Sequence, residues 1–206
     1  MANGITAITD LKNRVMPELP GCPAGYIEQV LKDVMRDFCI QTECWTEEIS
    51  QTLTEDETDY TLTPTATDAD IMRIAWVKIK STATDVVDDL YEQDTAHYKF
   101  DGVDALTLAT SATPTATVAT GLVTKVVLAP KINSATWAAG LMNRWADAIV
   151  AGVLAKLMAN KKESWGDPER AKDERNTYWN KIGLARFEAL RGFKTGSVST
   201  TVREWP

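Results

Sequence analysis

Histidine and cysteine are scarce in this chain. Its 206 residues include one histidine, His97, and three cysteines, Cys22, Cys39 and Cys44. A single histidine excludes zinc sites that need several, and it leaves a Ser/His/Asp triad only one candidate base. An odd number of cysteines without a CxxC pair does not fit a disulfide framework, so we expect free thiols. A zinc site built from all four residues stays open, although their spacing matches no compact zinc finger.

Long apolar runs and the common catalytic motifs are also missing. The longest apolar run, residues 148–155, is far shorter than the roughly 20 residues that span a bilayer. The first residues lack the basic and apolar regions of a secretory signal. No GxxxxGK[ST], GxGxxG, GxSxG or HExxH motif occurs. We therefore expect no membrane segment, no cofactor, no bound metal and no enzymatic activity.

Negative charge exceeds positive charge, but the two signs are separated along the chain. The net charge is -7. Residues 1–60 hold 4 Lys/Arg against 12 Asp/Glu, residues 61–130 hold 5 against 9, and residues 131–206 hold 13 against 8. The chain is therefore acidic at its beginning and basic at its end. Such asymmetry suits stacking of subunits, or a basic face beside an acidic partner.

The apolar pattern changes its period twice. After Pro20, apolar residues recur at helical spacing, which predicts an amphipathic helix with an inward face of Ile27, Val30, Leu31, Val34 and Phe38. Residues 45–129 are rich in threonine and valine and alternate with a period of two, which predicts short antiparallel strands.

Helical spacing returns after Pro130. It predicts helices over residues 135–159, capped by Ser134 or Thr136, and over residues 168–191. Both would be about 36 Å long at ~1.5 Å per residue, which favours an antiparallel hairpin. We expect a close helix contact at Gly152, and an inward face on the second helix formed by Tyr178, Ile182, Ala185 and Ala189.

The helical hairpin and its loop contain four of the seven tryptophans: Trp137, Trp145, Trp165 and Trp179. We expect them mainly in the core. An exposed Trp165 in the loop, beside Lys161 and Lys162, would instead suit a subunit interface.

The last eleven residues alternate like a strand without a core of their own to cover. We predict an extended arm over residues 196–206 that orders on a neighbouring protein. The residues expected to contact that partner are Gly196, Val198, Thr200, Val202, Arg203 and Trp205.

Together these patterns predict an α+β fold. Residues 1–44 and 131–195 form a helical bundle, residues 45–130 form an inserted antiparallel β-rich module, and residues 196–206 form the arm. Two other function classes stay open. A hydrolase could use paired carboxylates, for which Glu55, Asp56, Glu57 and Asp59 are available, although this run is typical of a solvated turn. A nucleic-acid-binding module could use the basic last helices, although acidic residues interleave there.

Several segments, taken in order, resemble the head-to-tail adaptor (connector) proteins of short-tailed bacteriophages. The landmarks are Leu19-Pro20-Gly21-Cys22-Pro23 before an amphipathic helix, and Trp165 with Asp167-Pro168 between two long helices. The segments are LPGCPAGYIEQVLKDVMRDFC, YTLTP, DADIMRIAWVKI, LVTKVVLAPK, WADAIVAGVLAKLM and KESWGDPERA.

The resemblance implies a structural virion protein. Such adaptors form rings, commonly of twelve copies, that dock on the portal in the neck, extend the DNA channel and offer a surface to the next tail or nozzle protein. It also implies that the C-terminal arm reaches the portal, and that DNA passes without specific binding. Another tail-completion or tail-proximal ring protein is the alternative within virions.

Overall fold

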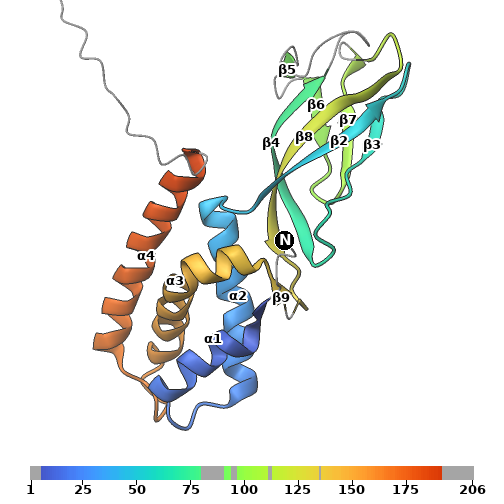
Figure 1. The fold of residues 1–206 in the computed structure, drawn as a ribbon. Coiled ribbons are helices and arrows are strands. Elements are labelled where there is room, and N and C mark those ends of the chain that lie inside the picture. The colour runs from blue at the N-terminus through green and yellow to red at the C-terminus, as the bar shows by residue number, and fades with distance from the viewer. Residues whose placement is uncertain (1–5, 80–90, 94–96, 111–112, 135, 192–206) are drawn as a thin grey trace, which may run out of the picture.

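The protein combines a group of helices with a group of antiparallel strands. The computed structural model describes residues 6–79, 91–93, 97–110, 113–134 and 136–191. Figure 1 shows the helices at one end and the strands at the other, so the predicted α+β fold class is confirmed. The predicted arm, residues 196–206, lies outside the described residues.

Four α-helices form the helical part. They are α1 (Ile8–Val15), α2 (Ala24–Thr42), α3 (Ala139–Met158) and α4 (Pro168–Leu190), with a 3-10 turn η1 (Met16–Glu18) after α1. The predicted inward face of α2 is confirmed, since all five of its apolar residues are buried. Among the described residues, no helix is long and apolar enough to cross a membrane.

The strands form three antiparallel sheets. One sheet has the order β2-β8-β4-β5 and a second has the order β3-β7-β6. The third pairs β1 (Thr6–Ala7) with β9 (Thr136–Trp137) and ties the first described residues to the entrance of α3. The remaining strands are β2 (Thr46–Leu53), β3 (Asp59–Thr61), β4 (Ala69–Ile79), β5 (Tyr91–Gln93), β6 (Tyr98–Phe100), β7 (Ala105–Leu108) and β8 (Val118–Pro130).

Strand β8 is the centre of the larger sheet. It pairs with β2 on one side and with β4 on the other. Alternate residues Leu122, Val126 and Leu128 are buried in the apolar core of the strands. At its end, Ala129 belongs instead to the core of the helices. Trp45, just before β2, packs against both cores, so the two parts of the molecule are joined by continuous apolar contact.

Helices α2, α3 and α4 approach one another closely at Gly152. A Cβ atom built on Gly152 of α3 would lie 2.7 Å from Cγ1 of Val34 and 2.9 Å from Cδ2 of Tyr178. Ordinary contacts between carbon atoms are about 3.5–4.0 Å. The predicted close contact at Gly152 is therefore confirmed, and it brings three helices to one point.

Two predictions about helix ends have different outcomes. The start of α4 is confirmed, because the Asp167 side chain accepts a hydrogen bond from the backbone N–H of Arg170 and Pro168 is the first helical residue. The start of α3 is wrong. The helix begins at Ala139 without a side-chain cap, because Thr136 and Trp137 are taken into the pairing with β1.

Candidate functional site

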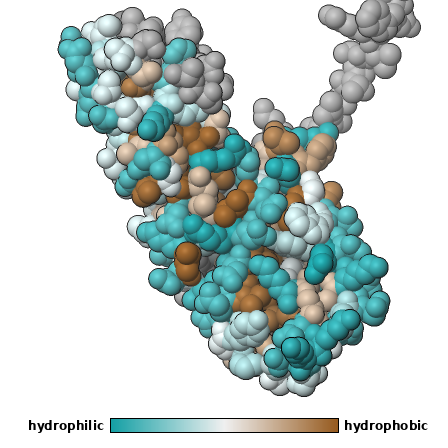
Figure 2. Space-filling model, turned by 180° about the vertical axis from the view of Figure 1, so that it is seen from behind, coloured by the Kyte–Doolittle hydropathy of each residue, from teal (hydrophilic) through white to brown (hydrophobic). Residues whose placement is uncertain are grey.

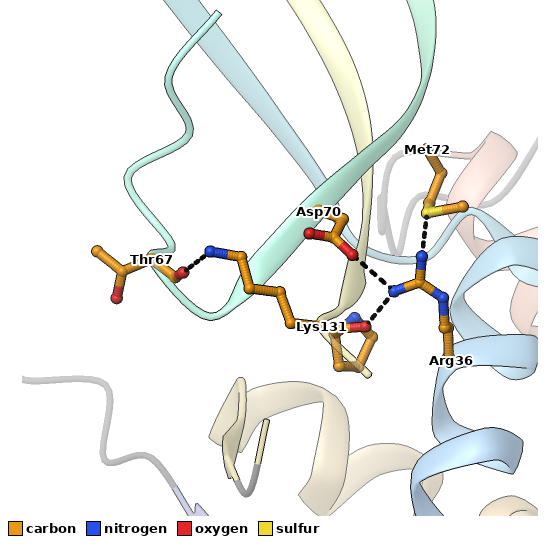
Figure 3. Close-up of polar contacts among 6 residues, drawn as sticks. Arg36, Thr67, Asp70, Met72 and Lys131 are labelled. Carbon is orange, nitrogen blue, oxygen red and sulfur yellow. Dashed lines mark hydrogen bonds and ion pairs between the residues drawn. The ribbon is translucent and has the colours of Figure 1, made fainter. Parts of the chain in front are cut away.

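A polar clamp joins the helices to the strands. It is centred on Arg36 of α2, whose Nη1 donates a hydrogen bond to Oδ2 of Asp70 in β4 at 2.9 Å and to the carbonyl oxygen of Pro130 at the end of β8 at 2.6 Å. Nη2 lies 3.5 Å from Sδ of Met72. Figure 3 shows the guanidinium between these three partners. One side chain of the helical part thus contacts two strands of the larger sheet.

The chain on either side of the clamp is held by a second set of bonds. Lys131, which follows β8, donates from Nζ to the carbonyl oxygen of Thr67 at 2.7 Å, and its backbone N–H donates to the carbonyl oxygen of Asp68 at 2.9 Å. On the β2 side, the N–H of Leu128 donates to the carbonyl oxygen of Trp45 at 2.8 Å. These bonds fix the segments that leave and enter the helical part.

A cleft of about 630 Å³ opens beside the clamp. Its charged lining residues are Arg36, Asp70, Asp104 and Lys131, and Leu62, Met72 and Val103 contribute apolar surface. Such a volume lies within the range of small-molecule sites. However, Arg36 and Asp70 bond each other and Lys131 bonds a backbone carbonyl. The Arg36–Asp70 pair of the cleft therefore joins the helices to the strands, and Lys131 ties the end of β8 to the chain before β4.

The loop that forms one wall of the cleft has a defined conformation. Oδ1 of Asp101 accepts hydrogen bonds from the backbone N–H groups of Val103, Asp104 and Ala105 at 2.8, 3.1 and 3.0 Å. These bonds, the one from Val103 above all, lower the pKa of the Asp101 carboxyl below its ordinary value. Gly102 has φ +90°, a conformation that residues with a side chain rarely adopt. The loop is thus built by its sequence rather than by contact with the bundle.

Buried Tyr178 of α4 contacts α2, the helix that carries Arg36. Its hydroxyl donates a hydrogen bond to Oδ2 of Asp37, the residue next to Arg36, at 3.1 Å. Burial raises the pKa of Tyr178 well above its ordinary value, and the Asp37 carboxylate raises it further. The neutral phenol is therefore the stable form in the folded protein, and it links α4 to α2.

The residues that the sequence offers for a metal do not come together. Within the described residues, which include Cys22, Cys39, Cys44 and His97, no group of three or more His, Cys, Asp or Glu is placed to hold a metal ion. All three cysteines are free, as predicted. Glu55, Asp56 and Glu57 lie in an exposed turn between β2 and β3, which agrees with the interpretation of this run as a solvated turn, and Asp59 is the exposed first residue of β3.

The predicted interface loop is only partly exposed. Lys161 and Lys162 are exposed, whereas Trp165 is half-buried and packs against the helical core. A Cβ on Gly166 would lie 2.1 Å from the carbonyl oxygen of Asn160, so this tight turn requires glycine. The loop presents its two lysines to solvent and uses its tryptophan to anchor itself.

The core assignment is right for two of the four tryptophans and wrong for a third. Trp137 and Trp145 are buried, but Trp179 of α4 is 50% exposed. The reason is that Tyr178, Ile182 and Ala185 already fill the inward face of α4. Trp179 therefore points away from the core.

Sequence reasoning missed the Arg36 clamp. Its partners lie 34 and 94 residues away along the chain, and a single arginine on the polar side of a helix gives no local signal of such contacts. Neither the family models nor the curated proteins include a match to this chain.

Proposed function

We propose that this chain is a subunit of a head-to-tail adaptor ring in the neck of a short-tailed bacteriophage. In this proposal the ring has the twelve copies common in such adaptors, docks on the portal protein and continues the DNA channel. Its other side binds the downstream tail or nozzle protein. The chain has a structural role rather than an enzymatic one, and it joins the virion in the host cytoplasm.

The proposal is supported most by where the segments of the resemblance lie in the fold. Each coincides with an element, or with the loop that starts one, and the two segments on β4 and β8 contribute to both cores, since Met72 and Ala129 pack with the helical core and their neighbours with the strand core. The segments correspond in order to α2 with its preceding loop, β3, β4, β8, α3 and the loop that begins α4. The resemblance is therefore compatible with the way the chain packs.

The clamp supports the same role on physical grounds. A subunit that transmits load between a head and a tail needs its two parts held in fixed relation. Arg36 and Lys131 supply bonds between segments distant in sequence, and Trp45 supplies apolar contact with both cores. Arg144 and Arg170 of the basic C-terminal helices pair with Glu188 and Glu18, which reduces the positive charge open to phosphate.

The test is binding to packaged heads that carry a portal but no tail. The purified chain should bind such heads, retain their DNA, and appear in cryo-electron microscopy as a ring directly below the portal. Heads without a portal are the control and should bind none. Failure to bind portal-bearing heads would contradict the proposal.

Experiments with the purified chain and with virions also distinguish the rival functions. A location in the distal tail would favour another tail-proximal ring protein. Strong DNA affinity that falls steeply with salt would favour a nucleic-acid-binding module. Hydrolysis that is lost on changing Asp70 or Asp104 to alanine would favour a carboxylate hydrolase acting in the cleft.

A further inference from the structure

An apolar stripe runs along the outer side of α4. Trp179, Leu184, Phe187 and Leu190 are exposed by 50, 55, 50 and 80%. Trp179, Phe187 and Leu190 are separated by eight and three residues, a spacing that places them on one face of a helix. Apolar residues scattered singly on a surface need no explanation, whereas three gathered on one face of a helix form a patch that suits an interaction.

The stripe faces away from the rest of the molecule. Helix α4 lies at the edge of the helical part in Figure 1, and it packs on α3 and α2 through its inward residues Tyr178, Ile182 and Ala185. In Figure 2, apolar atoms are visible at the C-terminal end of α4, on the right of the view. The stripe is therefore accessible to another protein.

Cations accompany the stripe. Lys172, Trp179 and Arg186 are exposed and follow one another at intervals of seven residues along α4, with Arg175 also exposed beside them. Two other cations of the hairpin form ion pairs, Arg144 with Glu188 and Arg170 with Glu18. Lys172, Arg175 and Arg186 make no ion pair with any residue in the described part of the chain. The partner surface should therefore combine apolar and acidic groups.

The outer face of α2 has this complementary chemistry. Tyr26, Asp33 and Ile40 are exposed and also follow one another at intervals of seven residues. This row is apolar, acidic, apolar, while the row on α4 is cationic, apolar, cationic. Asp33 accepts a bond from Gln29 but has no cationic partner among the described residues. Two copies of the chain thus carry matching surfaces on different helices.

We propose that the outer face of α4 in one copy of this chain docks on the outer face of α2 in the next copy. Contact between two different faces is heterologous, and repetition of such contacts closes into a ring when the rotation between copies allows it. An antiparallel pair of two α4 helices is disfavoured. In such a pair the same side of each helix faces its copy, so that Arg175 and Arg186 would lie opposite like charges. The assignment of this contact to a virion ring rests on the proposed function. The contact itself is argued only from the exposed and charged residues of α4 and α2.

The size of the stripe indicates what the contact can do. A helix of 23 residues is about 35 Å long and about 10 Å across, so one face offers roughly 350 Å². A standard interface buries about 800 Å² per partner. The α4–α2 contact therefore supplies the apolar centre of the interface, with Trp179 and Phe187 as its aromatic anchors, while neighbouring elements supply the rest.

The test measures self-association by sedimentation over a wide concentration range at low salt. Phe187→Glu combined with Leu190→Glu should raise the dissociation constant by about tenfold or more, since acidic groups replace buried apolar anchors. Val103→Glu, at an exposed apolar position in the loop between β6 and β7, is the matched control and should leave the dissociation constant unchanged. Circular dichroism should show every variant folded, because all changed residues are exposed.

Charge reversal tests the choice of α2 as the partner face. Arg186→Glu alone and Asp33→Lys alone should each weaken association, and the two together should restore it, whereas Lys156→Glu, at an exposed position of the largely buried α3, should have no effect. Failure of the double variant to recover would overturn the α4–α2 pairing.

Three outcomes bear on this inference, and two of them separate it from the proposed function. Chains that form rings on portal-bearing heads but are insensitive to the α4 variants would overturn the inference and leave the adaptor proposal intact. A wild-type chain that is monomeric at every concentration would likewise overturn it, because the stripe would then have no affinity for a second copy. Association that depends on α4, without any binding to portals, would support the inference and contradict the adaptor proposal.

Discussion

At Gly152, the close packing determines whether a change to alanine raises or lowers the stability of the protein. In the middle of an exposed helix, changing glycine to alanine stabilises a protein by about 0.5–1 kcal/mol, because alanine loses less conformational freedom on folding. At Gly152 the added methyl group would lie 2.7 Å from Val34 Cγ1 and 2.9 Å from Tyr178 Cδ2. Both neighbouring side chains are buried, and the Tyr178 hydroxyl is bonded to Asp37, so neither can withdraw freely.

Extra carbon atoms in a well-packed core cost about 1–3 kcal/mol. After subtraction of the gain in helix propensity, Gly152→Ala should destabilise the protein by about 1 kcal/mol. For a chain of this length that corresponds to a fall in Tm of roughly 2–4 °C. Gly152→Leu adds three more carbon atoms and should cost more, about 3 kcal/mol.

Gly183 of α4 is the matched control, because a Cβ there meets nothing within 4 Å. Gly183→Ala should raise Tm by about 1–3 °C in dilute protein, where association does not contribute. Differential scanning calorimetry measures both variants. If Gly152→Ala raised Tm as Gly183→Ala does, the three-helix contact and the argument from it would be refuted.

Three further predictions concern single bonds. Arg36→Met should lower the free energy of unfolding by about 1–3 kcal/mol in urea titrations, because it leaves the Asp70 carboxylate without its cation, and Asp70→Asn should cost less. Asp167→Ala should cost about 1 kcal/mol, measured in the same way, through loss of the α4 cap. Burial raises the pKa of Tyr178 above that in the unfolded chain, so stability should fall as pH rises above about 10, where only the unfolded chain ionises. Tyr178→Phe should flatten this decline in alkaline unfolding curves, and an unchanged slope would contradict it.

The sequence predicts the helices and strands well where the signal is local. On α2, buried apolar residues recur at spacings of three and four residues, and α4 starts at Asp167-Pro168. Both signals depend on neighbours within a few residues. The start of α3 was missed because pairing of Thr136 and Trp137 with β1 overrides helical spacing there. Their partners are about 130 residues away, which no local pattern records.

Burial is harder to predict than helix position when a helix is apolar on two sides. Helix α4 buries Tyr178 and exposes Trp179, its immediate neighbour. Hydrophobicity alone predicts that both residues are buried in the core. It cannot distinguish a core residue from an interface residue, because both environments favour aromatic side chains. The two residues are distinguished by their angular positions around the helix axis, because Trp179 lies away from the inward face formed by Tyr178, Ile182 and Ala185. A helix with an inward apolar face and a separate exposed apolar stripe indicates two partners.

The last prediction concerns residues 196–206, whose sequence predicts an arm that docks on the portal. This segment alternates like a strand without a core of its own to cover, so we do not expect it to contribute to either core. Truncation after Thr195 should therefore leave Tm unchanged. Ordering eleven residues costs about 1–2 kcal/mol each in backbone entropy, so docking must be stabilised by backbone pairing together with anchors such as Val198, Val202 and Trp205.

Under the adaptor proposal, the truncated chain should fold normally and fail to join portal-bearing heads. Trp205→Ala in the full chain is the finer test, because it removes the largest anchor and leaves the length of the segment intact. Gel filtration after incubation with heads measures both variants. Normal attachment of the truncated chain would show that the portal is held by the helices instead. Attachment that is lost on truncation but kept in Trp205→Ala would mean that backbone pairing, rather than the tryptophan ring, supplies the affinity.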